Sequence, residues 1–415
     1  MLRATTKVQL WVFLAILLIP TACNRPPSAS NTVLHVAVRE GLEAAGIRTL
    51  AAEFGKRRGM KVVVQAFGRD NYEVDTTNDL LSERPQYDVV FFPGTLVPEL
   101  AQRGGLAPVT GWSADSDRDL LTYTSYNGRI YGLPCDVSTF FLYYRSDIVK
   151  EVPDTWTDLL KVAPRYSHKM NSGISTAYGL ALGGKAGEDL IKGFYVLLWS
   201  YGGFIVENGQ VGLDSPAAFE AGRMLRQLVT SPAVPPDIQT WEVTKILDQL
   251  EKGTVAIAAP EWNAVYPLLR ADTAGFGRNV EVARIPGVRQ SDGQVHRVNF
   301  KQSWVLVKAA KSHDLAAANE FVLFATSPEG GRLYAETAHG NPARTSLLSD
   351  PVLQKERPEF PLLLDSLKIA KAEPEVPYYA KLSAIVNDAL TAIVAGTATP
   401  ETTLREAAKK VRGLL

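Results

Sequence analysis

The chain has 415 residues, of which 46% are hydrophobic and 21% are charged, a composition typical of folded globular proteins. At roughly 150 residues per domain, this length predicts two or three lobes and not a single core. The 44 basic and 44 acidic residues balance. This balance excludes the strongly basic surface of nucleic-acid-binding proteins and of helices that lie on membranes.

The N-terminal residues predict an export signal. Two basic residues precede the apolar run 10–19, which is too short to span a bilayer but has the length of a signal-peptide core. Pro20-Thr21-Ala22-Cys23 follows and resembles the lipobox of bacterial lipoproteins, in which the cysteine becomes the acylated first residue, although leucine is usual in place of Pro20. We predict a lipoprotein signal peptide over residues 1–22 and lipidation at Cys23; an ordinary secretory signal is the alternative.

A short polar segment rich in proline and serine, residues 23–32, follows the signal. It has nothing to bury, so it is predicted to be a flexible tether between an anchor and a folded body. The chain has only two cysteines, and Cys135 is left without a partner if Cys23 is acylated. The sequence predicts no disulfide, no metal site and no cofactor.

Strands and helices alternate in the first part of the folded chain. Strands are predicted over 33–38, 61–65 and 87–92, with helical segments between them. This alternation predicts a parallel sheet covered by helices. Ligands of such sheets sit beyond the carboxyl ends of the strands, so the candidate positions are residues 39–41 and 92–95.

The stretch 128–149 is predicted to pass from one lobe into a second. It contains the apolar and aromatic run 140–144, which is typical of a strand buried on both faces. Asp136 lies just upstream of this strand, where a buried carboxylate is costly unless another group pairs with it. A hydrated loop aspartate is the alternative.

Capping patterns mark several helix starts in the second half of the chain. Thr155 and Asp158 form a capping-box pattern, Ser215 precedes a proline at the first position of a helix, and Thr399 begins the last helix. The other predicted elements are a helix over 191–201, strands over 254–259, 280–285 and 300–307, an exposed hairpin or loop over 287–295, and helices from 312, 327 and 378.

Residues 179–185 match the glycine and lysine spacing of a phosphate-binding loop. The next residue is Ala186, so the Ser or Thr that holds magnesium in such loops is missing. We therefore interpret this segment as a turn.

The motifs, taken in order, resemble the extracellular family 1 solute-binding proteins of ABC importers, the group that includes maltose-binding protein. Each motif is weak alone, but their order and spacing over nearly the whole mature chain are specific. The motifs are YDVVFFPG, NGRIYGLP, LYYRSDI, VPDTWTDL, WSYGG, GTVAIAAPEW, SWVLV, AANEFVLFATSPEGG and GNPAR.

The resemblance implies an α/β fold of the two-lobed periplasmic-binding-protein type (type II), in which each lobe is a mainly parallel sheet flanked by helices and the chain crosses three times at a hinge. Ligand binds in the cleft, the lobes close, and the closed form is delivered to the permease subunits of an ABC importer. The implied crossings lie near 140–144, 299–305 and 340–344. The implied lobes are 33–140 plus 300–340 and 141–299 plus 341–415.

The resemblance also implies a set of cleft residues. Sugars need aromatic rings for their apolar faces, and carboxylates or guanidinium groups for their hydroxyls. The three tryptophans of the set would serve the first need and Glu40, Asp136 and Arg344 the second; the alternatives are tryptophans in a lobe core and an Arg344 that caps a helix or pairs on the surface. The set is Arg39, Glu40, Phe92, Thr95, Asp136, Trp199, Tyr201, Trp262, Ser303, Trp304 and Arg344.

Three hypotheses for the function follow. The first is a monomeric, lipid-anchored protein of the cell envelope, in the periplasm or on the outer face of the cytoplasmic membrane, that binds a mono- or oligosaccharide without enzymatic activity. The second is the same fold binding another small polar solute. The third is an envelope-tethered hydrolase, for which the chain has no GxSxG or HExxH motif, although its 44 acidic residues offer many carboxylate pairs for a glycosidase.

Overall fold

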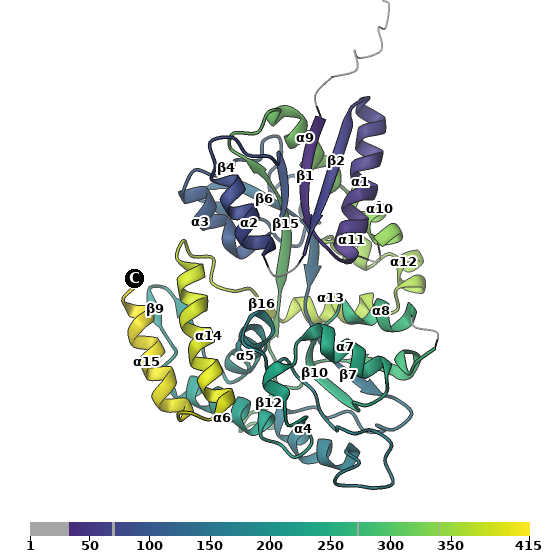
Figure 1. Cartoon of the computed structure of the whole chain (residues 1–415), viewed down its shortest axis with the longest axis vertical. Coiled ribbons are helices and arrows are strands. Elements are labelled where there is room, and N and C mark those ends of the chain that lie inside the picture. The colour runs from purple at the N-terminus through teal and green to yellow at the C-terminus, as the bar shows by residue number, and fades with distance from the viewer. Residues whose placement is uncertain (1–32, 69–70, 272–273, 339) are drawn as a thin grey trace, which may run out of the picture.

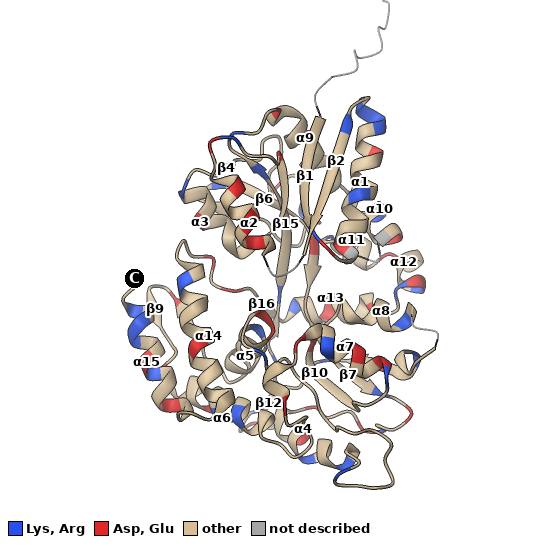
Figure 2. Cartoon of the chain, viewed as in Figure 1, with Lys and Arg blue, Asp and Glu red and all other residues tan. Residues whose placement is uncertain are grey.

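The computed structural model describes residues 33–68, 71–271, 274–338 and 340–415. The predicted signal peptide, Cys23 and the tether lie outside the described residues. Two α/β lobes lie one above the other (Figure 1), the upper built on a seven-stranded sheet and the lower on a three-stranded sheet. The predicted two-lobed α/β fold is confirmed. Basic and acidic residues are interspersed over both lobes (Figure 2), in keeping with the balanced composition.

The sheet of the upper lobe has the strand order β2-β1-β3-β15-β6-β5, and β4 also pairs with β15. β1 is parallel to β2 and β3, whereas β15 is antiparallel to β3, β4 and β6, and β5 is antiparallel to β6. β15 and β5 therefore run in the opposite direction to the other five strands. The strands are β1 (Val33–Arg39), β2 (Lys61–Phe67), β3 (Val89–Pro93), β4 (Leu106–Ala107), β5 (Thr124–Tyr126), β6 (Arg129–Ser138) and β15 (Gln302–Ala309).

Helices flank both sides of this sheet, with α1 and α10 on one side and α2 and α3 on the other in Figure 1. The strands are buried between them: Val36, Phe91 and Leu306 have no exposed surface. The helices of the upper lobe are α1 (Leu42–Arg58), α2 (Tyr72–Leu80), the short 3-10 helix η1 (Gly94–Leu96), α3 (Val97–Gln102), α9 (Leu315–Ala325) and α10 (Pro328–Ala338).

The sheet of the lower lobe consists of β7 (Phe140–Arg145) between β10 (Ile257–Trp262) and β11 (Val280–Ala283). Both pairings are antiparallel, so the expectation of a mainly parallel sheet is wrong for this lobe. The reason is that β7 leads away from the upper lobe, whereas β10 leads back to the cleft between the lobes. The upper sheet is mixed, because only the pairings of β1 with β2 and β3 are parallel.

Most of the remaining helices and short strands build the rest of the lower half of the molecule, whereas α11 and α12 lie beside α10, above α13 (Figure 1). No helix in the described ranges is long and apolar enough to cross a bilayer. These elements are α4 (Trp156–Val162), η2 (Ala163–Tyr166), α5 (Glu188–Ser200), β8 (Val206–Glu207), β9 (Gln210–Val211), α6 (Pro216–Val229), η3 (Ile238–Thr240), α7 (Val243–Glu251), α8 (Val265–Ala271), η4 (Gly277–Asn279), β12 (Val288–Arg289), β13 (Val295–His296), β14 (Asn299–Phe300), α11 (Thr345–Leu348), α12 (Pro351–Glu356), α13 (Phe360–Lys368), β16 (Ala370–Lys371), α14 (Tyr379–Ala395) and α15 (Pro400–Arg412).

The local signals in the sequence are confirmed where they concern caps and turns. The side chains of Thr155, Ser215 and Thr399 each accept a hydrogen bond from the amide three residues later, at 3.0, 3.2 and 3.3 Å, which satisfies an otherwise unpaired amide of the first helical turn. The predicted hairpin over 287–295 is the antiparallel pair β12 and β13.

The chain passes between the lobes at three places that lie side by side. Only Thr139 separates β6 from β7, and only Lys301 separates β14 from β15. The Thr139 hydroxyl donates to the carbonyl of Phe300 at 2.6 Å, which joins the first passage to the second. The third passage is the segment 340–344. The amide of Val137 donates to the carbonyl of Asn341 at 3.0 Å, which joins the first passage to the third.

Replacing Ser215 by alanine tests the capping of α6. The variant loses the acceptor for a first-turn amide, so the free energy of unfolding should fall by about 1 kcal/mol. Chemical denaturation monitored by circular dichroism measures this loss. The control is Ser291→Ala, in the exposed turn between β12 and β13, which should change stability by less than about 0.5 kcal/mol. Equal effects of the two substitutions would contradict the assignment.

Candidate functional site

Three adjoining cavities lie in the cleft between the lobes, at the carboxyl ends of β1 and β3. Their volumes are about 360, 240 and 60 Å³. We call them the α14 cavity, lined in part by Tyr379, Ser383 and Asn387; the Lys185 cavity; and the tryptophan cavity, lined by Trp262 and Trp304. Glu188, the first residue of α5, lines all three, so it stands where they meet.

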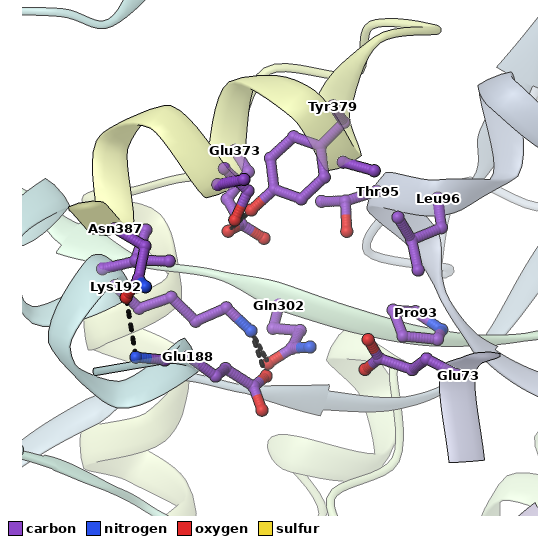
Figure 3. A pocket seen from close by; sticks show the side chains of 15 residues that line it. Glu73, Pro93, Thr95, Leu96, Glu188, Lys192, Gln302, Glu373, Tyr379 and Asn387 are labelled. Atoms are coloured by element: carbon purple, nitrogen blue, oxygen red, sulfur yellow. Dashed lines mark hydrogen bonds and ion pairs between the residues drawn. The ribbon is translucent and has the colours of Figure 1, made fainter. Parts of the chain in front are cut away.

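The α14 cavity is lined by residues of both lobes, and most of them are polar (Figure 3). The upper lobe contributes η1, α2 and the start of β15, and the lower lobe contributes α5 and α14. Its lining residues are Glu73, Pro93, Thr95, Leu96, Gly187, Glu188, Ile191, Lys192, Gln302, Glu373, Tyr379, Ala380, Ser383, Ala384 and Asn387.

Lys192 is the central cation of this cavity (Figure 3). Only 5% of it is exposed, and its Nζ donates to a carboxylate oxygen of Glu188, one helical turn before it, and to Oε1 of Gln302 at 2.9 Å. Gln302 begins β15 of the upper lobe, so this contact crosses between the lobes. A buried ammonium held in this way is fixed in position and can offer a donor to a ligand.

Glu373 and Tyr379 form a second buried polar pair in the same cavity. The Tyr379 hydroxyl donates to the Glu373 carboxylate. Tyr379 is 7% exposed and Glu373 is 3% exposed. Burial raises the pKa of Glu373, and the positive charge of Lys192 acts against this shift. The pair presents a carboxylate to the cavity, and such groups bind ligand hydroxyls or cations.

Arg39 ends β1 in the tryptophan cavity. Its guanidinium carbon lies 4.1 Å from the centre of the Trp304 ring, and only 8% of the residue is exposed. It forms ion pairs with Glu43 at 3.6 Å and with Glu188 of the lower lobe at 3.9 Å. Trp304 also stacks on Phe91, with ring centroids 5.3 Å apart. Arg39 therefore lies over the ring that was predicted to receive a sugar.

Trp262 is the last residue of β10 and was predicted to follow the strand. Its indole Nε1 donates to Asp189 at 2.7 Å, and its ring packs on Phe140 with centroids 4.3 Å apart. The residue is 8% exposed. It lines the tryptophan cavity, but most of its ring is already in contact with protein.

Four of the predicted cleft residues line these cavities, and seven do not. Arg39, Thr95, Trp262 and Trp304 line them. Of the others, Glu40 is exposed and pairs with Arg48 at 4.0 Å, while Tyr201 and Ser303 are half-buried at the end of α5 and in β15. Phe92 is buried in the upper core, and Trp199 stacks on Phe300 in the lower core. Asp136 and Arg344 are held in the passages between the lobes.

Asp136 joins the first passage to the third from within the protein. One of its carboxylate oxygens accepts from the amide of Asn341 at 2.9 Å and from the hydroxyl of Tyr334 at 3.0 Å, and the other accepts from Ser138 at 3.2 Å. Burial and the negative charge of Glu43 raise the pKa of Asp136 to about 7, although the hydrogen bonds act in the opposite direction. The side chain is thus hydrogen-bonded within the protein, as a buried polar group requires, but has no opposite charge beside it.

Arg344 likewise has protein partners. Its guanidinium forms a bidentate pair with Asp117, at 2.9 and 2.5 Å, and contacts Asp119 at 3.3 Å, while its Nε donates to the carbonyl of Thr326 at 2.8 Å. Only 3% of the residue is exposed. A fully engaged guanidinium of this kind fixes the third passage and has little left to offer a ligand.

Several cavity residues were not predicted. Gln302 had a visible signal, because it is polar at the start of an apolar strand. The segment interpreted as a turn, 179–185, leads into α5, and Lys185 and Gly187 line the Lys185 cavity; a glycine-rich stretch before a helix was thus a usable signal. Glu73, Glu373 and Tyr379 had none, because only the tertiary fold brings them to the cleft.

A cleft between two α/β lobes, entered by polar side chains from both and spanned by three chain passages, defines a two-lobed solute-binding protein. Residues 49–361 match the family described as bacterial extracellular solute-binding protein, and the chain belongs to this family. Among the residues that the structure describes, no group of three or more His, Cys, Asp or Glu is placed to hold a metal ion.

Known proteins similar to this chain extend over most of its length. A maltooligosaccharide ABC transporter solute-binding lipoprotein of Streptococcus pneumoniae (TIGR4) is 26% identical, over 79% of this chain and 77% of that protein. Maltose-bound MalE3 of T. maritima has a TM-score of 0.79 at 23% identity, over 92% and 100% of the two chains. An ABC transporter solute-binding protein of Agrobacterium radiobacter K84 in complex with ribitol has a TM-score of 0.80 at 20% identity, over 93% and 100%. These structures confirm the two-lobed fold.

Replacing Asp136 by asparagine tests the buried carboxylate. Its pKa is raised in the folded protein to about 7, above the unfolded value of about 3.9. The contribution of this group to wild-type stability is therefore fully present below pH ~4 and is lost as the pH rises through 7. Asparagine lacks this titration. Between pH 5 and 8 the stability of the variant relative to wild type should rise by on the order of 2 kcal/mol.

Denaturation at a series of pH values measures this difference. Asp115→Asn, at an exposed aspartate of the same lobe, is the control and should follow the wild-type profile. Parallel profiles for Asp136→Asn and wild type would show that the carboxylate is not strained by burial.

Proposed function

We propose that this protein captures a carbohydrate, a mono- or oligosaccharide, in the cleft between its lobes and delivers it to the permease subunits of an ABC importer. The observation that carries the proposal is the α14 cavity, where polar side chains of both lobes converge on about 360 Å³. Support comes from relatives: the Streptococcus protein is a maltooligosaccharide-binding lipoprotein, and the two solved structures hold maltose and ribitol. Another small polar solute is the second candidate.

The physical basis is closure of the cleft around polar groups. We propose that residues 33–140 plus 300–340 and residues 141–299 plus 341–415 move as two bodies about the three passages. Closure removes water, which strengthens each hydrogen bond between ligand hydroxyls and the charged groups of the cleft. Lys192, Glu188 and Glu373 would supply these groups, and Gln302 would contribute its amide.

The proposed ligand residues combine predicted and newly found positions. Of the predicted set, we retain the four that line the cavities. Arg39, Trp262 and Trp304 line the adjoining cavities and are proposed to shape the cleft. The proposed ligand contacts line the α14 cavity: Thr95 from the sequence, with Glu188, Lys192, Gln302, Glu373, Tyr379 and Asn387 added from the geometry.

We further propose that Cys23 is acylated after removal of residues 1–22, so that the protein is anchored at the outer face of a membrane through residues 23–32. The lipoprotein relative supports this proposal. The protein is proposed to bind its solute without changing it, so the tethered hydrolase is the less favoured reading.

A thermal-shift screen of monosaccharides, polyols and maltooligosaccharides tests the binding function. A ligand at ~100 times its dissociation constant should add ~2.7 kcal/mol of stability, and chromatography should recover it unchanged. If an amino acid or polyamine stabilises the protein and no carbohydrate does, the carbohydrate proposal is wrong. Conversion of a sugar during incubation would instead support the hydrolase.

Replacing Glu373 by glutamine tests the α14 cavity as the binding site. The variant keeps the shape of the side chain but loses its charge, and a hydrogen bond to a charged group contributes about 1.5–3 kcal/mol, so affinity should fall roughly 10- to 100-fold. Isothermal titration calorimetry measures it. The control is Glu406→Gln, at an exposed glutamate of α15. Unchanged affinity in the Glu373 variant would move the site out of this cavity.

Replacing Cys23 by alanine tests the anchor. The full-length protein should incorporate labelled fatty acid and sediment with membranes, whereas the variant should do neither. Cys135→Ala, at the buried second cysteine, is the control and should retain the label. A wild-type protein recovered wholly in the soluble extracellular or periplasmic fraction would favour the ordinary secretory signal.

A further inference from the structure

One ion pair crosses the cleft from the upper to the lower lobe. Glu188 lines all three cavities, and Arg39 lines the tryptophan and Lys185 cavities but not the α14 cavity. Arg39 reaches from the upper lobe to within 3.9 Å of Glu188 in the lower lobe. Glu188 and Gln302 line both the α14 cavity and the tryptophan cavity and so form the wall between them. Arg39 pairs with Glu188 on the side of this wall that faces Trp304.

The aromatic surface of the tryptophan cavity is covered. Trp304 is 2% exposed and has the Arg39 guanidinium 4.1 Å from its ring centre, while Trp262 is 8% exposed and packs on Phe140. A chain of sugar units bound along a cleft needs open aromatic faces for its successive rings. A sugar ring can stack on the covered face of Trp304 only after Arg39 has moved.

Arg39 is held by weak contacts for a buried guanidinium. Its ion pairs, at 3.6 and 3.9 Å, are longer than hydrogen bonds, and its buried Nε forms no hydrogen bond with any residue in the described ranges. Buried donors without acceptors are costly. The position over Trp304 is therefore maintained by stacking on the ring and by two nearby carboxylates, and not by a fixed network such as that around Arg344.

We propose that Arg39 sets the length of the ligand: by covering Trp304 and pairing with Glu188 across the cleft, it restricts binding to the α14 cavity and to a single sugar unit or short polyol. This inference rests on the proposed carbohydrate-binding function. The volume of the α14 cavity, about 360 Å³, is near the lower end of the range of about 300–1,000 Å³ for small-molecule sites, and its lining is rich in groups that bond hydroxyls.

The experiment compares ligand lengths in Arg39 variants. Calorimetry on the mature protein gives the dissociation constants of glucose, ribitol, maltose and maltotriose for wild type, Arg39→Ala, Arg39→Met and the surface control Arg48→Ala. Wild type should bind the better of glucose and ribitol at least about tenfold more tightly than maltose. Arg39→Ala uncovers Trp304 and removes one ion-pair partner of Glu188 in the wall between the cavities, so this preference should fall by about tenfold or reverse.

The methionine variant separates coverage from charge. Its unbranched side chain still covers the ring, so the length preference should persist even if absolute affinity falls. Arg39→Gln, which is shorter but polar, replaces the alanine variant if that protein does not fold. Arg48→Ala should match wild type throughout.

Two outcomes would overturn the inference and leave the proposed function standing: a wild-type protein that binds maltose or maltotriose as tightly as the single unit, or an Arg39→Ala protein that folds and keeps the wild-type preference. Failure of all four probes, together with the wider carbohydrate panel, to bind wild type would instead reject the proposed function, and the inference with it.

Discussion

The structure depends on the hydrogen bonds between three chain passages that run side by side from one lobe to the other. Backbone groups buried there have no access to water and must find partners in the surrounding protein, including the neighbouring passage. Thr139 illustrates this constraint: its amide donates to the Asn263 side chain at 2.9 Å and its hydroxyl donates to the carbonyl of Phe300 at 2.6 Å. Because these bonds fix the passages to one another, the proposed motion of the lobes would have to occur in the residues that flank them.

Charged side chains hold the third passage from opposite sides. The carboxylate of Asp136, in the upper sheet, accepts from the amide of Asn341 at 2.9 Å. The guanidinium of Arg357 donates to the carbonyl of Gly340 and to the side chain of Asn341, both at 3.0 Å, and pairs with the buried Glu359 at 2.6 Å. Glu359 compensates the buried charge of Arg357, whereas Asp136 has only neutral donors around it, and burial raises its pKa. This arrangement explains why polar residues near the hinge face protein and not the cleft.

Local chemistry made the elements predictable, whereas distant contacts decided the roles of individual residues. Thr155, Ser215 and Thr399 act over three residues, so the sequence placed their helix starts correctly. The two-lobed fold followed from the order of the motifs. Arg344 could not be interpreted in this way, because its partner Asp117 lies 227 residues earlier in the chain. Strand direction in the lower sheet was unpredictable for the same reason, since periodicity reports burial and not pairing.

Helix α5 shows why the cleft was only partly predictable. Glu188, Lys192, Tyr195 and Trp199 follow one another at intervals of four, three and four residues, and so lie on one face of the helix. Glu188 and Lys192 line the cleft, but Trp199 stands roughly 10 Å further along the axis at 1.5 Å per residue, where it stacks on Phe300 with centroids 6.1 Å apart. The pattern gives the face of a helix but not the depth at which the cleft ends. The Phe300 ring also packs against Trp262, with centroids 5.8 Å apart, and has the Lys192 Nζ at 5.5 Å. A shift of the second passage would therefore change the packing beneath two cleft residues, so the proposed closure would have a direct physical route to the site.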